Sequence, residues 1–159
     1  MAIYLFSVSI VIVLTVACLL MGIAFTARKN AVMTYDWFSA AMDYAAEAAN
    51  MNRDLSKVEA NTGLARQYFV HSFARMTGTK WDGHNFNPNE ETYPGPIKLT
   101  GFSYTSPGQA VPGGTAKQPG YTATIEVPVI QGNIPFVGQQ YITVPMRYLG
   151  VIKPQITRS

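Results

Sequence analysis

The most constraining feature of this sequence is an unbroken apolar stretch over residues 2–27, AIYLFSVSIVIVLTVACLLMGIAFTA, which contains no charged side chain. Folded as an α-helix it would be about 39 Å long at 1.5 Å per residue, which exceeds the roughly 30 Å hydrocarbon core of a bilayer. Only 13% of the whole chain is charged, about half the share typical of globular proteins. The sequence therefore predicts a helix that lipid or other protein chains must cover, joined to one compact domain.

The flanks of this stretch bear on its processing and its orientation. A cleaved secretory signal has a basic start and a shorter apolar core, whereas nothing basic precedes this stretch and its core is longer, so we expect an uncleaved anchor. Arg28 and Lys29 follow it directly and would by themselves keep the next domain in the cytoplasm. A basic leader removed just before Met1 would have set the opposite orientation. Met1 could equally be the translation start, and the sequence does not decide between the two.

The helix is expected to continue well beyond residue 27. The next segment is free of proline and rich in alanine and methionine, which favour helices. We predict one continuous helix of about 50 residues and about 75 Å, ending near Asn52, of which only the amphipathic second half can carry a domain. Its apolar side chains recur at a spacing of three or four residues, on one face: Val32, Tyr35, Phe38, Met42, Ala45 and Ala49.

A second, shorter helix is predicted over residues 56–76. Ser56 can cap its start, and Glu59 three residues later completes a capping-box pattern. Gly63 is a candidate kink, and Gly78 is a candidate stop because glycine readily adopts the left-handed conformation of a helix C-cap.

The rest of the chain predicts an α+β fold. Residues 77–96 are dense in Gly, Pro, Asn and Asp and predict an exposed loop of about 20 residues. Strands are predicted over 97–104, 120–129 and 139–152 from their β-branched and aromatic residues. Pro128 and Pro145 predict edge strands or strand ends, because proline donates no ladder hydrogen bond. The expected organisation is a transmembrane or filament-core helix (1–27) and an extracytoplasmic domain (28–159), whose parts are helical (28–76), loop (77–96) and a small antiparallel sheet of three or four strands (97–152).

No catalytic or cofactor chemistry is predicted. His71 and His84 stand in no HExxH or CxxC context, the single cysteine, Cys18, lies in the apolar stretch, and no GxSxG motif is present. The segment 82–91 offers oxygen ligands for calcium, but its spacing departs from that of an EF-hand, and an ordinary solvated loop is the preferred interpretation. A net charge of +3 with scattered basic residues does not favour nucleic acid binding. We expect a non-enzymatic protein without metal, cofactor or nucleic acid.

The layout of the chain resembles that of type IV pilins: a helix that is apolar and then amphipathic, a turn-rich loop and a small antiparallel sheet. Two segments are similar to the Tad-type (TadE-like) pseudopilins, the alanine-rich MDYAAEAANMN at 42–52 and VPVIQGNIPFVGQQYITV at 127–144. The chain departs from mature pilins around Leu5, where every residue is uncharged and those pilins carry a glutamate.

The resemblance implies a structural subunit of an extracellular filament on the cell surface. The helix would lie in the inner (cytoplasmic) membrane before assembly, and with the pilus assembly machinery it would be extracted to pack against copies of itself. The alternative is a membrane-anchored accessory (minor) pseudopilin that does not form the bulk filament. Cys18 and Gly22 permit close helix approach, and Gly22 is also a place for local helix loosening. Helix-packing and assembly contacts are expected at Leu5, Phe6, Val13, Cys18, Gly22, Phe25, Tyr35, Phe38 and Met42.

Overall fold

The computed structural model describes residues 2–51, 59–89, 92–134 and 138–153. The helical elements come first: helix α1 (Ala2–Asn50), the short 3-10 helix η2 (Glu59–Asn61) and helix α2 (Thr62–Thr77). The strands follow: β1 (Thr79–Trp81), β2 (Asn85–Pro88), β3 (Ile97–Thr105), β4 (Ala110–Val111), β5 (Gly114–Thr115), β6 (Gly120–Ile134) and β7 (Gly138–Val151). The α+β layout expected from the sequence, a long N-terminal helix and a small antiparallel sheet, is confirmed.

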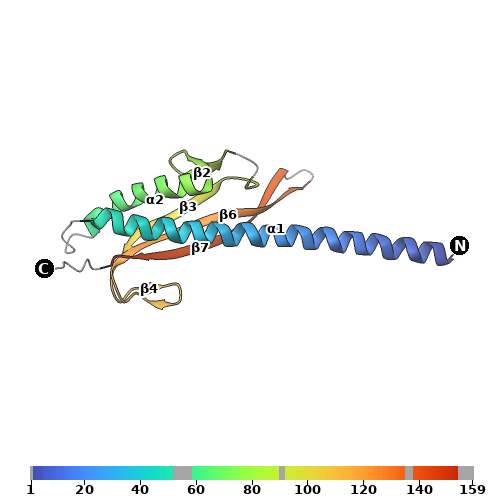
Figure 1. Cartoon of the computed structure of the whole chain (residues 1–159), viewed down its shortest axis with the longest axis horizontal. Helices are drawn as coiled ribbons and strands as arrows, with labels where there is room; N and C mark the ends of the chain where they lie inside the picture. The colour runs from blue at the N-terminus through green and yellow to red at the C-terminus, as the bar shows by residue number, and fades with distance from the viewer. Residues whose placement is uncertain (1, 52–58, 90–91, 135–137, 154–159) are drawn as a thin grey trace.

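Helix α1 dominates the shape of the molecule. It is 49 residues long and ends at Asn50, close to the predicted Asn52. Its N-terminal half projects from the molecule alone, while its C-terminal half lies along the sheet (Figure 1). Within the described ranges it is the one helix long and apolar enough to cross a membrane, by length and composition. One rigid rod thus joins an isolated apolar segment to a folded domain.

Five antiparallel strands form the main sheet in the order β1-β2-β3-β6-β7, and β4 and β5 form a separate hairpin. Strands β6 and β7 pair from Gly120 and Val151 to Ile134 and Gly138, whereas β3 pairs with β6 only as far as Glu126. The two-stranded ribbon therefore continues alone past the end of β3, and its far end bends away from α1 (Figure 1). We call this ribbon, residues 129–134 and 138–142, the arm.

The core lies between the helices and the sheet. Helix α1 packs on β6 and β7, and α2 packs on α1, β1 and β3. Phe38 of α1 meets Phe69 and Phe73 of α2 edge-on, with ring centroids 5.8 and 6.1 Å apart, and Phe73 in turn meets Phe86 of β2 at 4.9 Å. All four rings are fully buried, and aromatic side chains of this size dominate core energetics. The helical side of the core also contains a seam of buried small residues: Ala41, Ala45, Ala46 and Ala49.

The prediction that residues 77–96 form a loop was wrong. This segment contains β1 and β2, which pair with each other and extend the sheet beyond β3. Its turn residues close a tight hairpin instead of an open loop: the Asp82 carboxylate Oδ1 accepts the backbone N–H groups of His84 and Asn85 at 2.9 and 2.7 Å. The sheet therefore has five strands, not three or four.

Two smaller predictions also needed correction. The α-helix α2 begins at Thr62, after η2, so Glu59 lies in the 3-10 helix and Gly63 lies in the first turn without forming a kink. Ser56 is outside the described residues, whereas the predicted stop at Gly78 is confirmed, with φ of 65°.

Strand β7, which carries Pro145, is an edge strand as predicted, but β6 is central. Pro128 fits in β6 because it lies next to a bulge and beyond the point where β3 pairing ends.

Candidate assembly surface

The projecting half of α1 exposes apolar side chains on every side. Their exposed fractions run from 44% at Ile10 to 72% at Met21. Its hydroxyl groups add little polarity, because Thr15 and Thr26 donate to the carbonyl oxygens of Val11 and Gly22 in the preceding turn, at 2.8 and 3.0 Å. An apolar surface of this extent marks a contact with lipid or protein. The exposed side chains are Val8, Ile10, Val11, Ile12, Val13, Leu14, Val16, Leu19, Leu20, Met21, Ile23 and Phe25.

A groove separates α1 from the arm. It has a volume of about 540 Å³ and is lined on β6 by Val129, Ile130 and Gln131. On the helix it is lined by Cys18, Leu19, Gly22, Ile23, Thr26 and Ala27. None of the described residues that line it is charged. On the helix side its small residues are Cys18, Gly22 and Thr26, and a Cβ added to Gly22 would have no atom within 4 Å. The groove therefore leaves room for side chains from outside the chain.

A short segment between β2 and β3 ties the helix to the base of the arm. The Tyr93 hydroxyl pairs with that of Thr34 at 2.8 Å, and because Thr34 itself donates to the Asn30 carbonyl oxygen, Tyr93 is the donor to Thr34. Burial raises the pKa of Tyr93 above its ordinary value. The Tyr141 ring of β7 lies against Gly95, where an added Cβ would be 2.8 Å from a ring carbon. These contacts hold the arm at a fixed place beside α1.

The amphipathic half of α1 is held to the sheet by polar as well as apolar contacts. The Tyr148 hydroxyl of β7 donates to both carboxylate oxygens of Asp43, at 3.2 and 3.1 Å. Partial burial, and then the Asp43 charge, raise the pKa of Tyr148. At the end of the helix, the Asn50 side-chain amide donates to the Tyr121 hydroxyl at 3.2 Å and its carbonyl accepts from Asn61 at 3.0 Å. Buried polar groups that are paired in this way specify one packing arrangement.

The nine residues expected to make packing and assembly contacts fall into three groups. Leu5 and Phe6 belong to α1, but their side chains lie outside the described part of the chain. Phe38 and Met42 are fully buried in the core of the chain itself, so a neighbouring copy cannot contact them. The exposed group is Val13, Cys18, Gly22, Phe25 and Tyr35.

Tyr35 marks the boundary between these regions. Its side chain is 43% exposed, and its ring meets that of Tyr148 edge-on at 6.2 Å. It is the most C-terminal of the five exposed positions, and it already contacts β7 through Tyr148. Sequence reasoning did not find the arm as a flank of this surface. The available signal was the uncharged run from residue 127 to 146, which is longer than the expected strands require.

The oxygen-rich turn at Asp82 is structural. Besides the two backbone donors, its Oδ2 accepts the Asn87 side-chain amide at 2.8 Å. The hydrogen bonds from Asn85 and His84 hold the pKa of the Asp82 carboxyl well below its usual range. Both carboxylate oxygens therefore accept hydrogen bonds within the turn, and among the described residues no three His, Cys, Asp or Glu side chains cluster as a metal site would require. Glu90 and Glu91 lie outside the described residues.

The chemistry of the projecting helix and the groove is that of an apolar contact surface. Side chains of this kind bind lipid tails or other apolar helices through packing, without directional polar groups. The groove adds a shape that a smooth single helix does not have. Comparison with protein-family models, with curated proteins and with solved structures finds no match to this chain.

Proposed function

We propose that this chain is a structural subunit of an extracellular type IV pilus-like filament, which polymerises through the N-terminal half of α1. The observation that carries the proposal is that residues 8–25 expose apolar side chains on all sides, outside a domain whose own core is complete without them. Burying one such side chain is worth about 1.5–3 kcal/mol. A dozen of them provide a strong and non-directional drive to be covered.

The continuity of α1 supports repeated assembly. The same helix that projects from the domain carries Phe38, Met42 and the alanine seam of the core. Its apolar half therefore keeps one direction relative to the sheet, as a regular polymer needs. In such a filament the helices would be central, and the sheet with the β1–β2 hairpin would face outward.

The exchange of lipid for protein contacts sets the energetics of assembly. A helix that starts in the membrane gains no hydrophobic free energy on entering a filament, because lipid tails already cover it. The gain must come from packing, and the groove beside Gly22 and Cys18 is where close packing is possible. Extraction itself would be the work of the assembly machinery.

A second candidate is a membrane-anchored accessory pseudopilin whose helix stays in lipid. The length and composition of α1 favour it equally, since they suffice to cross a bilayer. The two functions differ in what covers the helix: copies of the chain in a filament, or lipid in the anchored form.

Electron microscopy of material sheared from cells that make the protein separates the two, when combined with N-terminal sequencing of the isolated chain. Filaments with this chain as their main component are the expected result, and the sequencing identifies the processed end. Recovery of the chain only from the membrane fraction, with no filaments containing it, would replace the filament proposal with the accessory one.

A further inference from the structure

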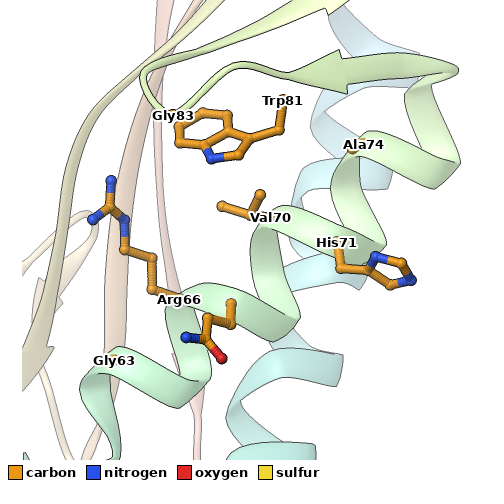
Figure 2. A pocket seen from close by; sticks show the side chains of 8 residues that line it. Gly63, Arg66, Val70, His71, Ala74, Trp81 and Gly83 are labelled. Carbon is orange, nitrogen blue, oxygen red and sulfur yellow. The ribbon is translucent and has the colours of Figure 1, made fainter.

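A second groove lies on the domain, between α2 and the turn that joins β1 to β2. It has a volume of about 650 Å³, within the roughly 300–1,000 Å³ typical of ligand sites. Figure 2 shows the indole of Trp81 across Val70, with the Arg66 and His71 side chains extending on opposite sides. Val70, Ala74 and the half-buried indole supply its apolar surface. This groove is remote from the projecting helix.

The polar side chains of this groove are not engaged by the part of the chain that the structure describes. Among the residues that the structure describes, no side-chain hydrogen bond or ion pair engages Arg66, Gln67, His71 or the indole N–H of Trp81. Arg66, Gln67 and His71 are exposed and Trp81 is half-buried, so these polar groups are hydrated in the free chain and open to a ligand. Four unengaged polar side chains around an apolar floor are therefore available to a ligand.

Among the described residues, the side chains that line the groove carry charge of one sign only. No Asp or Glu of the described residues lines it. The Asp82 carboxylate lies outside the lining, in the adjacent turn, where it accepts three hydrogen bonds. Arg66 is permanently cationic and can form two parallel hydrogen bonds to a carboxylate. Gln67 and the indole N–H add neutral donors. The complementary ligand has an anionic group, several acceptor oxygens and one apolar face.

We propose that this groove binds a carboxylate-bearing saccharide, such as a chain of uronic acids. A pyranose ring has an apolar face of C–H bonds that fits Val70 and Trp81, and a rim of hydroxyl groups for Gln67 and the indole N–H. Arg66 binds the sugar carboxylate. Single-stranded nucleic acid fits less well, because such sites track the backbone with several cations and stack successive bases. Among the described lining residues, Arg66 is the one Arg or Lys and Trp81 is the one Phe, Tyr or Trp. The proposal goes beyond filament assembly and concerns the individual subunit.

The test uses the full chain in detergent micelles, with Trp37→Phe to leave Trp81 as the only tryptophan. Trigalacturonic acid is titrated while the Trp81 fluorescence is recorded, and its fully methyl-esterified form, which has the same rings without charge, serves as the matched ligand. We expect a saturable fluorescence change with the acid and at least tenfold weaker binding of the ester. Equal affinities for the two, or no saturable change with the acid, would overturn the proposal.

Two charge variants separate a site from general attraction to a basic protein. Arg66→Gln should weaken binding at least tenfold, whereas Arg75→Gln removes the same charge from the exposed last turn of the same helix, outside the groove lining, and should change affinity less than twofold. Circular dichroism checks that both variants fold. Equal losses in the two variants, or tighter binding of oligothymidylate than of the saccharide, would reject the acidic-saccharide site. None of these readouts depends on filaments. The saccharide site can therefore be rejected while the filament proposal stands, and the filament proposal can be rejected while the saccharide site stands.

Discussion

Gly150 of β7 lies directly against the backbone of Met42 in α1: a Cβ added to Gly150 would stand 2.6 Å from the Met42 carbonyl oxygen and 3.4 Å from the Ala46 Cβ. At this point the helix and the sheet are too close for a side chain on residue 150. The direction in which the apolar half of α1 projects depends on this contact, since the helix continues through it without a break.

Gly150→Ala should therefore destabilise the domain. A backbone atom cannot move aside as a flexible side chain can, and overpacking of this kind costs about 1–3 kcal/mol. Thermal unfolding of the full chain in detergent, followed by circular dichroism, measures the loss. Gly101→Ala is the control, because its Cβ would have its nearest atoms, on Thr124, at 3.9 Å, and its stability should be unchanged or higher. Equal stability of the two variants would contradict the close contact.

Arginine in the helix groove should prevent assembly if the filament proposal is right. Gly22→Arg and Cys18→Arg each place a charge on the apolar surface beside the arm, where burial of an unpaired charge is strongly unfavourable. The expected result is a complete loss of sheared filaments, with the chain still present in the membrane fraction. Gln118→Arg adds the same charge to an exposed position of the domain and should leave filaments intact. Abundant filaments from Gly22→Arg would contradict polymerisation through this part of α1.

The tyrosine pKa values predict a loss of stability in alkali. The pKa values of Tyr93 and Tyr148 are raised from 10.0 in the folded chain, in both cases mainly by burial. Above about pH 10 these hydroxyl groups lose their protons in the unfolded chain, whereas in the folded chain they stay protonated to a higher pH. Their contribution is therefore fully present below the unfolded pKa and is lost as the pH rises through the folded pKa. Melting temperatures measured from about pH 8 to 11 should fall less steeply for the Tyr93→Phe/Tyr148→Phe variant, and identical slopes would refute the shift.

Asp82→Ala should loosen the β1–β2 hairpin. It removes the acceptor for three donors, the backbone N–H groups of His84 and Asn85 and the Asn87 amide. Hydrogen exchange should become faster at residues 79–88, while His84→Ala, which keeps the backbone donor, should exchange like the original chain. Because the pKa of Asp82 is lowered, the carboxylate contribution is present above the unfolded value near 3.8 and is lost only as the pH falls below it. Calcium should not change the exchange rates, and calcium-dependent protection would restore the metal-site interpretation.

The candidate assembly surface shows how far sequence patterns can reach. Absence of charge over residues 2–27 and a three-to-four spacing afterwards identified the long helix, because both are local properties of one segment. The same patterns grouped Phe38 and Met42 with Tyr35, although the first two are fully buried in the chain and Tyr35 is 43% exposed. Periodicity gives the face of a helix, but it does not say where along the helix the sheet stops.

By itself, the sequence determined the elements whose signals are local: the continuous first helix, with its end predicted two residues beyond the observed Asn50, the stop at Gly78 and the three long strands. The tertiary structure alone decided the rest, because it depends on contacts between distant residues. Asp43 meets Tyr148 across 105 positions of the chain, and β1 and β2 become strands because β3 offers them an edge. Likewise, the arm lies beside α1, and Trp81 lies over Val70, only once the sheet has formed. Each of these contacts stabilises the fold only when the other segments are already in place, so no single segment of the sequence specifies it.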